Sequence, residues 1–220
     1  MINKLAGSLY RKSGSLFAPG IKGGRTIMYD VLIIGAGPGG IFSAYELIRQ
    51  DPQLKVGVFE AGHELNRRKC PIDGKKIKTC IGCKSCSIMS GFGGAGAFSD
   101  GKYNITNDFG GTLYEYIGKK NALELMHYVD EINMAFGGKG TKLYTTAGSR
   151  IKKMCLQNDL HLLDASVRHL GTDINYVVLE NLYAFLKDKV DFFFDTPVET
   201  VRVTEDGYEL SAGGKTYSCR

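Results

Sequence analysis

One stretch of this sequence constrains its fold more than any other: a glycine-rich turn that joins a short apolar run to an amphipathic segment. The run Val31–Ile34 has the length and the continuous apolar character of a parallel strand that is buried on both faces. Residues 41–50 have the apolar spacing of a helix, and Val56–Phe59 is a second strand-like run. The order strand, turn, helix, strand predicts a βαβ unit, and hence an α/β chain with a parallel sheet.

The turn itself has the spacing G-x-G-x-x-G. Its candidate cofactor-binding residues are Gly35, Gly37, Pro38, Gly39 and Gly40, followed after the second strand by Glu60 and Ala61. Glycines in such a turn permit a tight bend, a close approach of a pyrophosphate and close helix–strand packing, while the helix N-terminus offers N–H groups to the phosphates. Glu60 stands twenty residues after Gly40, where a carboxylate can accept hydrogen bonds from a ribose. The sequence therefore predicts a dinucleotide site.

Four cysteines follow the second strand with the spacing C-x9-C-x2-C-x2-C: Cys70, Cys80, Cys83 and Cys86. Lysine and arginine residues surround them, which favours thiolates and offsets the negative charge of a metal centre. Four thiolates could hold zinc or an iron–sulfur cluster. The alternative is a loop of free thiols, one or two of them reactive, and both interpretations stay open at this point.

A second glycine segment, residues 90–101, follows the cysteines. It has five glycines within eleven residues, a composition that is unsuited to the interior of a helix or strand and that lets a ligand approach the backbone closely. Phenylalanines alternate with these glycines, which distinguishes the segment from a flexible linker. We expect it to face the cofactor through the candidate contacts Gly91, Gly93, Gly94, Ala95, Gly96 and Ser99.

Residues 112–189 are predicted to be mostly helical, and we interpret them as an insertion into the nucleotide-binding domain or as a substrate region. The expected N-caps of the helices are Asn121, Ser149 and Thr172. Arg168 and His169, in a polar turn before a helix, are the candidate catalytic residues, because a histidine titrates near neutral pH. The alternative role for this turn is capping and packing.

Three short strand-like runs, separated by turns at 206–207 and 213–214, predict a β-meander after a third strand at Asp191–Asp195. We assign residues 29–111 and 190–220 to a Rossmann-type nucleotide-binding domain that uses the meander as a crossover. Strands 4 and 5 of a doubly wound sheet have no counterpart before Arg220. We therefore expect a truncated chain whose nucleotide-binding domain is incomplete.

Charge and hydropathy argue against two kinds of partner. The net charge of +5 is mild and its basic residues are scattered or lie in loops, so nucleic acid is not expected. No apolar run reaches the length of a membrane-spanning helix, so a membrane partner is not expected either. Residues 1–28 lack the apolar block of a signal peptide, which favours a disordered leader and a cytoplasmic protein.

From Tyr29 to Arg220 the sequence resembles the amino-terminal part of the predicted FAD-dependent dehydrogenases, a family of two-domain flavoproteins. The resemblance is carried by DVLIIGAGPGG at 30–40, CPI at 70–72, CIGCKSC at 80–86, GFGGAGAFSDGK at 91–102 and RHLGTD at 168–173. It implies FAD as the cofactor, with the second glycine segment along the flavin or its phosphates. NAD(P)H is a further candidate, as the electron donor.

The sequence thus favours an FAD-dependent oxidoreductase that takes a hydride or an electron pair from a donor and passes it on. Two alternatives of other classes stay open. One is a non-catalytic module that binds NAD or another nucleotide, and the other is an electron-transfer protein whose cysteines hold an iron–sulfur cluster. Neither the small-molecule substrate nor the oligomeric state follows from the residues.

Overall fold

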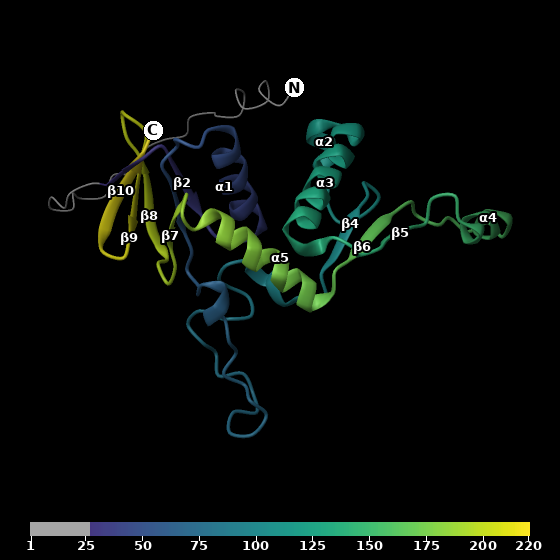
Figure 1. The fold of residues 1–220 in the computed structure, drawn as a ribbon, viewed down its shortest axis with the longest axis horizontal. Helices are drawn as coiled ribbons and strands as arrows, with labels where there is room; N and C mark the ends of the chain where they lie inside the picture. The colour runs from purple at the N-terminus through teal and green to yellow at the C-terminus, as the bar shows by residue number, and fades with distance from the viewer. Residues whose placement is uncertain (1–26) are drawn as a thin grey trace.

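The computed structural model describes residues 27–220, and three small β-sheets organise this part of the chain (Figure 1). One of them is the parallel sheet expected from the sequence. Its strands β2 (Val31–Ile34), β3 (Val56–Phe59) and β7 (Asp191–Phe193) lie in the order β2-β3-β7, all parallel. Helix α1 (Pro38–Gln50) connects the first two strands. The Rossmann-type α/β fold is therefore confirmed.

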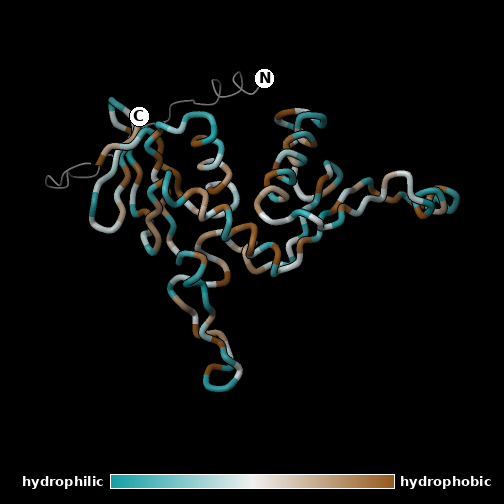
Figure 2. Tube along the Cα trace, in the orientation of Figure 1, coloured by the Kyte–Doolittle hydropathy of each residue, from teal (hydrophilic) through white to brown (hydrophobic). Residues whose placement is uncertain are grey.

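The main core lies between this sheet and two helices. Helix α5 (Gly171–Leu186) precedes β7 and shares one buried cluster with α1 and with Val56 and Val58 of β3. Apolar side chains of β2 and β3, coloured brown in Figure 2, pack against these helices. Burial of each large apolar side chain stabilises the fold by about 1.5–3 kcal/mol. This core positions the turn between β2 and α1.

The predicted β-meander is also present. Strands β8 (Val198–Val203), β9 (Tyr208–Ala212) and β10 (Lys215–Cys219) pair antiparallel, and β1 (Ile27–Tyr29) joins them in parallel to β10. The prediction of a disordered leader up to residue 28 is therefore wrong for Ile27 and Met28, because strand β10, distant in the sequence, pairs with them. Residues 1–26 of that leader lie outside the described residues.

The third sheet was not anticipated. Strands β4 (Lys102–Ile105), β5 (Leu143–Thr145) and β6 (Ser166–His169) form an antiparallel sheet in the order β4-β6-β5. Two of these strands lie within the region that we expect to be mostly helical. The helices of that region are α5 and, before it, α2 (Leu113–Ile117), α3 (Lys119–Asn133), the π-helical turn η4 (Met134–Gly138) and α4 (Arg150–Gln157).

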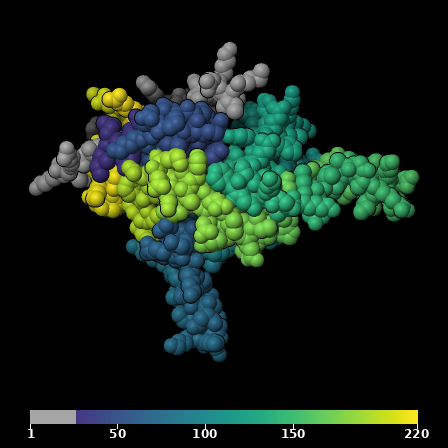
Figure 3. All heavy atoms as spheres, in the orientation of Figure 1, coloured from purple at the N-terminus to yellow at the C-terminus, as the bar shows by residue number. Residues whose placement is uncertain are grey.

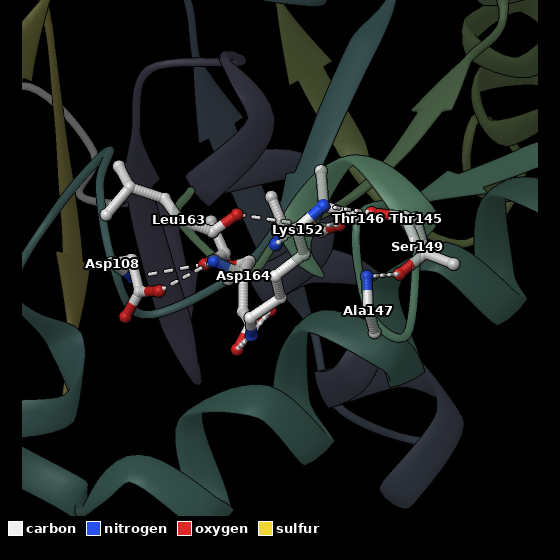
Figure 4. Close-up of polar contacts among 10 residues, drawn as sticks. Asp108, Thr145, Thr146, Ala147, Ser149, Lys152, Leu163 and Asp164 are labelled. Atoms are coloured by element: carbon white, nitrogen blue, oxygen red, sulfur yellow. Dashed lines mark hydrogen bonds and ion pairs between the residues drawn. The ribbon is translucent and has the colours of Figure 1, made fainter. Parts of the chain in front are cut away.

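Two segments extend from the body of the molecule (Figures 1 and 3). One is an arm, residues 139–165, that carries α4 near its tip; the other is the cysteine loop, residues 69–89, between the 3₁₀ turns η2 (Leu65–Arg67) and η3 (Gly94–Phe98). Within the arm, the Thr146 hydroxyl donates to the Leu163 carbonyl at 2.9 Å, and Lys152 of α4 pairs with Asp164 (Figure 4). Short polar contacts thus hold an otherwise extended segment.

The helix caps agree with the sequence at one of three positions. Ser149 caps α4, since its hydroxyl oxygen accepts from the Lys152 N–H at 3.2 Å. The other two predictions are wrong: α3 begins at Lys119, so Asn121 lies inside its first turn, and Thr172 lies inside α5 and donates to the Ser99 carbonyl at 3.1 Å. Among the described residues, no helix combines the length and the apolar character that crossing a membrane requires.

Candidate functional site

The turn between β2 and α1 lies where β2 and β3 end together. The Gly35 N–H donates to the Phe59 carbonyl at 2.7 Å, which fastens the turn to β3. Gly40 cannot carry a side chain, because an added Cβ would lie 1.9 Å from the Gly35 carbonyl oxygen. No side chain of the described residues caps α1, which begins with Pro38. Its first N–H groups therefore lack a side-chain acceptor and can serve an anionic ligand.

Glu60 connects this turn to the second glycine segment. One carboxylate oxygen, Oε2, accepts from the Ala36 N–H at 2.8 Å, and the other, Oε1, accepts from the N–H groups of Gly62 at 2.8 Å and Gly91 at 2.9 Å. The side chain is buried. Because a carboxylate has about four acceptor positions, three of them are used within the protein, and a contact of Glu60 with a ribose hydroxyl stays a prediction.

The two glycine segments lie against each other, although about fifty residues separate them. The Gly93 N–H donates to the Ala36 carbonyl at 2.8 Å, and an added Cβ at Gly94 would lie 3.2 Å from the Gly37 Cα. The 3₁₀ turn η3 then continues to Ser99, whose hydroxyl donates to the Gly96 carbonyl at 2.9 Å. All the predicted cofactor-binding residues are thus gathered around one junction; the exposed ones among them are Pro38, Gly39, Ala61, Ala95, Gly96 and Ser99.

A buried arginine, Arg68, holds the second glycine segment in place, and the sequence did not single it out for this role. Its guanidinium donates to the carbonyls of Ser87, Ile88, Phe92 and Gly94 at 2.7–2.9 Å. Burial is the main cause that lowers the pKa of Arg68 below its ordinary value, which still leaves an arginine charged. Four charge-assisted hydrogen bonds to backbone carbonyls make this a strong organising contact.

A cavity of about 430 Å³ opens beside the junction of the glycine segments, within the usual range for cofactor pockets. Its walls are mainly apolar and come from both glycine segments and from α1, β4, α3 and α5: Pro38, Gly39, Ile41, Phe42, Gly93, Gly96, Ser99, Gly101, Lys102, Tyr103, Val129, Asn133, Asn175, Leu179 and Leu182. A larger hollow of about 630 Å³ lies at the meander, away from both glycine segments. The cavity beside the glycine segments is therefore the candidate site.

Two buried asparagines border this cavity, and their hydrogen bonding differs. Asn175 is satisfied within the protein, since its Oδ1 accepts from the Tyr103 hydroxyl at 2.8 Å and its Nδ2 donates to the Gly96 carbonyl at 3.0 Å. The side-chain nitrogen of Asn133, which is 1% exposed, has no hydrogen-bond partner among the described residues. No sequence signal marks either residue, because both acquire their surroundings from elements distant in the chain.

The candidate catalytic residues Arg168 and His169 lie on β6 and do not line this cavity. Arg168 donates to both carboxylate oxygens of Asp130 at 2.7 Å and to the Thr141 carbonyl at 2.6 Å. Its side chain is about nine-tenths buried, and the carboxylate of Asp130 is the main cause that raises the pKa of Arg168. The structure thus gives Arg168 structural partners, whereas His169 is exposed, and a catalytic role for either residue stays a prediction.

The four cysteines of the cysteine loop are not gathered in this structure. Cys70 is half-buried, Cys80, Cys83 and Cys86 are exposed, and all are free thiols. Within residues 27–220, no three His, Cys, Asp or Glu side chains form a group that could hold a metal ion. The donor set is therefore not preassembled, and a zinc or iron–sulfur centre stays an untested prediction.

No family model matches the sequence, and no curated protein matches it. Among solved structures, the chain is similar to glycine oxidase from Geobacillus kaustophilus, with 16% identity, a TM-score of 0.48, and coverage of 88% of this chain and 54% of that one. It is also similar to pqsL, a probable FAD-dependent monooxygenase from Pseudomonas aeruginosa, at 15% identity and a TM-score of 0.42, covering 87% of this chain and 40% of that one.

A third similar structure is NikD, described as an unusual amino acid oxidase. Its identity is 11% and its TM-score 0.43, with coverage of 88% of this chain and 50% of that one. The chain thus spans about half the length of these solved proteins. All of these TM-scores lie below 0.5, so the likenesses are too loose to bear on the chemistry of this chain.

Proposed function

We propose that this chain binds FAD at the junction of its two glycine segments and forms part of a flavin-dependent oxidoreductase. The observation that carries the proposal is the attachment of the second glycine segment to the dinucleotide turn, through Glu60 and through the Gly93–Ala36 hydrogen bond, beside a largely apolar cavity. A nucleotide alone needs only the first turn and the adjacent helix N-terminus. The second segment and the cavity add a site for a flat, mostly apolar ring system, which agrees with the family resemblance of the sequence.

The residues present fit such a cofactor. The N–H groups at the start of α1, including that of Gly39, would hold the pyrophosphate, and the remaining acceptor position of Glu60 would hold the ribose. The backbone of η3 and the apolar walls contributed by Leu179 and Leu182 would enclose the isoalloxazine and exclude water from it. When bound, the flavin supplies the hydride and electron-transfer chemistry, whereas the protein supplies orientation and access.

The direct test is titration of the purified chain with FAD, with NAD⁺ and with NADPH, followed by flavin fluorescence and calorimetry. We expect FAD to bind at one site and the nicotinamide nucleotides to bind at least tenfold more weakly, because the second glycine segment and the cavity suit the flavin. Absence of FAD binding would overturn the proposal. Tight binding of NAD⁺ without FAD would instead support the non-catalytic nucleotide-binding alternative.

A variant of Gly37 tests the position of the cofactor without disturbing the fold. Gly37 has an ordinary φ of −73°, and an added Cβ would meet only the Gly94 Cα at 4.0 Å, so the backbone can accept a side chain. We expect Gly37→Val to keep the melting temperature of the parent and to lower FAD affinity at least tenfold, because the new side chain occupies the approach to the turn. Ala147→Val on the exposed arm is the matched control.

A further inference from the structure

A second, smaller cavity adjoins the candidate cofactor site, and the proposed binding of FAD does not use it. Its volume is about 220 Å³, and its walls come from strand β4 and from helices α2 and α3. Tyr103 and Val129 line both cavities, so the two are immediate neighbours. A molecule in the smaller cavity would therefore lie next to a flavin ring bound in the larger one.

The chemistry of the walls favours one kind of ligand group. Apart from Tyr103 and Val129, the apolar residues of the smaller cavity are Ile105, Leu113, Leu125 and Met126. The other two lining residues are Asn104 and Asp130, and both carboxylate oxygens of Asp130 already accept from Arg168 at 2.7 Å. No lysine, arginine or histidine of residues 27–220 lines this cavity. An anionic group would lose its hydration there without gaining a positive partner, so the cavity suits an uncharged, apolar group.

The wall that the two cavities share has a fixed aromatic residue. The Tyr103 hydroxyl donates to the Asn175 Oδ1 atom of α5 at 2.8 Å. Burial raises the pKa of Tyr103 above its ordinary value, so the phenol stays neutral. Since the hydroxyl proton is bound by Asn175, Tyr103 contributes to this wall chiefly as an apolar ring.

The smaller cavity has its own access from solvent. Ile105 is only 5% exposed, whereas Leu113 and Leu125 are 40% and 41% exposed, although all three line the same cavity. The two leucines therefore lie at its rim. A substrate must enter and leave while the cofactor stays bound, and a separate opening beside the cofactor cavity permits this exchange.

We infer that the smaller cavity is the substrate site of the proposed oxidoreductase and that it binds an uncharged, apolar group of a small molecule. Ligand pockets are usually concave and lined mainly by apolar and aromatic side chains, as this one is. The inference rests on the proposed function and names the class of its substrate. For residues 112–189, which the sequence favours as an insertion or a substrate region, it supports the second role.

The test is calorimetric titration of the chain, with and without FAD, using two probes of the same ring system. Indole is uncharged, and indole-3-carboxylate adds an anionic group. We expect indole to bind at one site and indole-3-carboxylate to bind at least about tenfold more weakly, because the walls offer no counter-charge. Equal affinities for the two probes, or no binding of indole, would overturn the inference.

Two variants place the probe in the cavity. Leu125→Trp on α3 and Leu113→Trp on α2 each fill the cavity from its partly exposed rim, so we expect each to weaken indole binding by about tenfold or more. FAD affinity should stay unchanged in both, because neither residue lines the larger cavity. Leu156→Trp on the arm, where the leucine is 59% exposed, is the matched control and should change neither affinity.

The outcomes separate this inference from the proposed function. Unchanged indole affinity in both rim variants, or FAD binding without indole binding, would overturn the inference alone. Failure of the parent chain to bind FAD would overturn the proposed function, and with it the substrate role of the cavity, even if indole binds.

Discussion

The cysteine loop and the second glycine segment are neighbours in the sequence, and both contain unusual motifs, but the fold treats them differently. The glycine segment is fastened to the core by long-range hydrogen bonds from Arg68, to Glu60 and to Ala36. In the cysteine loop, the hydrogen bonds beyond Arg68 at its base are local, such as those of the Asp73 carboxylate with the next few N–H groups. The loop extends away from the body (Figure 1).

This difference separates two kinds of ligand site. A site whose backbone is already held in place can bind a cofactor without a large ordering cost, which is the situation at the junction of the glycine segments. Exposed, ungathered thiols can form a metal site only if the metal itself orders the loop, since metal binding then couples to local folding. Variants that loosen the junction of the glycine segments should therefore lower the stability of the protein more than variants of the cysteine loop do.

Loss of the Glu60 carboxylate should have the largest effect. Glu60→Ala leaves three buried N–H groups without an acceptor, at about 1–3 kcal/mol each, so we expect the free energy of unfolding to fall by at least about 3 kcal/mol. Chemical denaturation measures this change, and Glu199→Ala on the exposed surface of β8 is the control. A loss below about 1 kcal/mol would show that the carboxylate does not fasten the two segments.

Replacement of Arg68 should come next. Arg68→Met keeps the apolar stem but removes the donors to four carbonyls, so we expect a loss of about 2–3 kcal/mol. Faster tryptic cleavage at the lysines of the cysteine loop should accompany it, because the base of the loop is released. Arg67→Met is the control: its side chain is 59% exposed and pairs only at the surface with Asp195. Equal cleavage rates in the two variants would contradict the role of Arg68.

Cysteine variants should have a small effect in the absence of metal. Cys83 is exposed and free, so Cys83→Ser should change the free energy of unfolding by no more than about 0.5 kcal/mol in a buffer that contains a chelator. Metal analysis of protein prepared without oxygen completes the experiment. Stoichiometric zinc or iron, released by Cys83→Ser, would show that a metal gathers the cysteines and makes the loop a second ordered site.

The smallest expected effect is a pH dependence within the cysteine loop. Backbone N–H groups of Ile77, Lys75 and Lys76 hydrogen-bond the Asp73 carboxylate and hold its pKa below the ordinary value of 3.8. Because the pKa of Asp73 is lowered in the folded protein, its carboxylate stabilises the turn fully at pH values above the ordinary pKa. This stabilisation is lost as the pH falls through the lowered pKa. An NMR titration of Asp73 should find this lowered midpoint, and an ordinary midpoint would mean that the turn is not formed.

Local patterns were enough to predict much of the fold. The turn between β2 and α1, the three β-meander strands and the N-cap Ser149 depend on residues close in sequence, whose glycines, apolar spacing and side-chain oxygen act over a few positions. Strands β1, β4, β5 and β6 were missed, because their pairing depends on partners elsewhere: Ile27, for example, is paired with Tyr217. The short-range part of the candidate site could thus be predicted, but its long-range part could not.

The sequence by itself determined the dinucleotide-binding turn, the parallel strands around it and the presence of a second glycine segment. Only the tertiary structure decided that Glu60 joins these two segments and that Arg68 holds the second one. The reason is physical. Backbone conformation and amphipathic spacing are written in consecutive residues, whereas a buried charge or amide takes its role from the partners that packing brings to it.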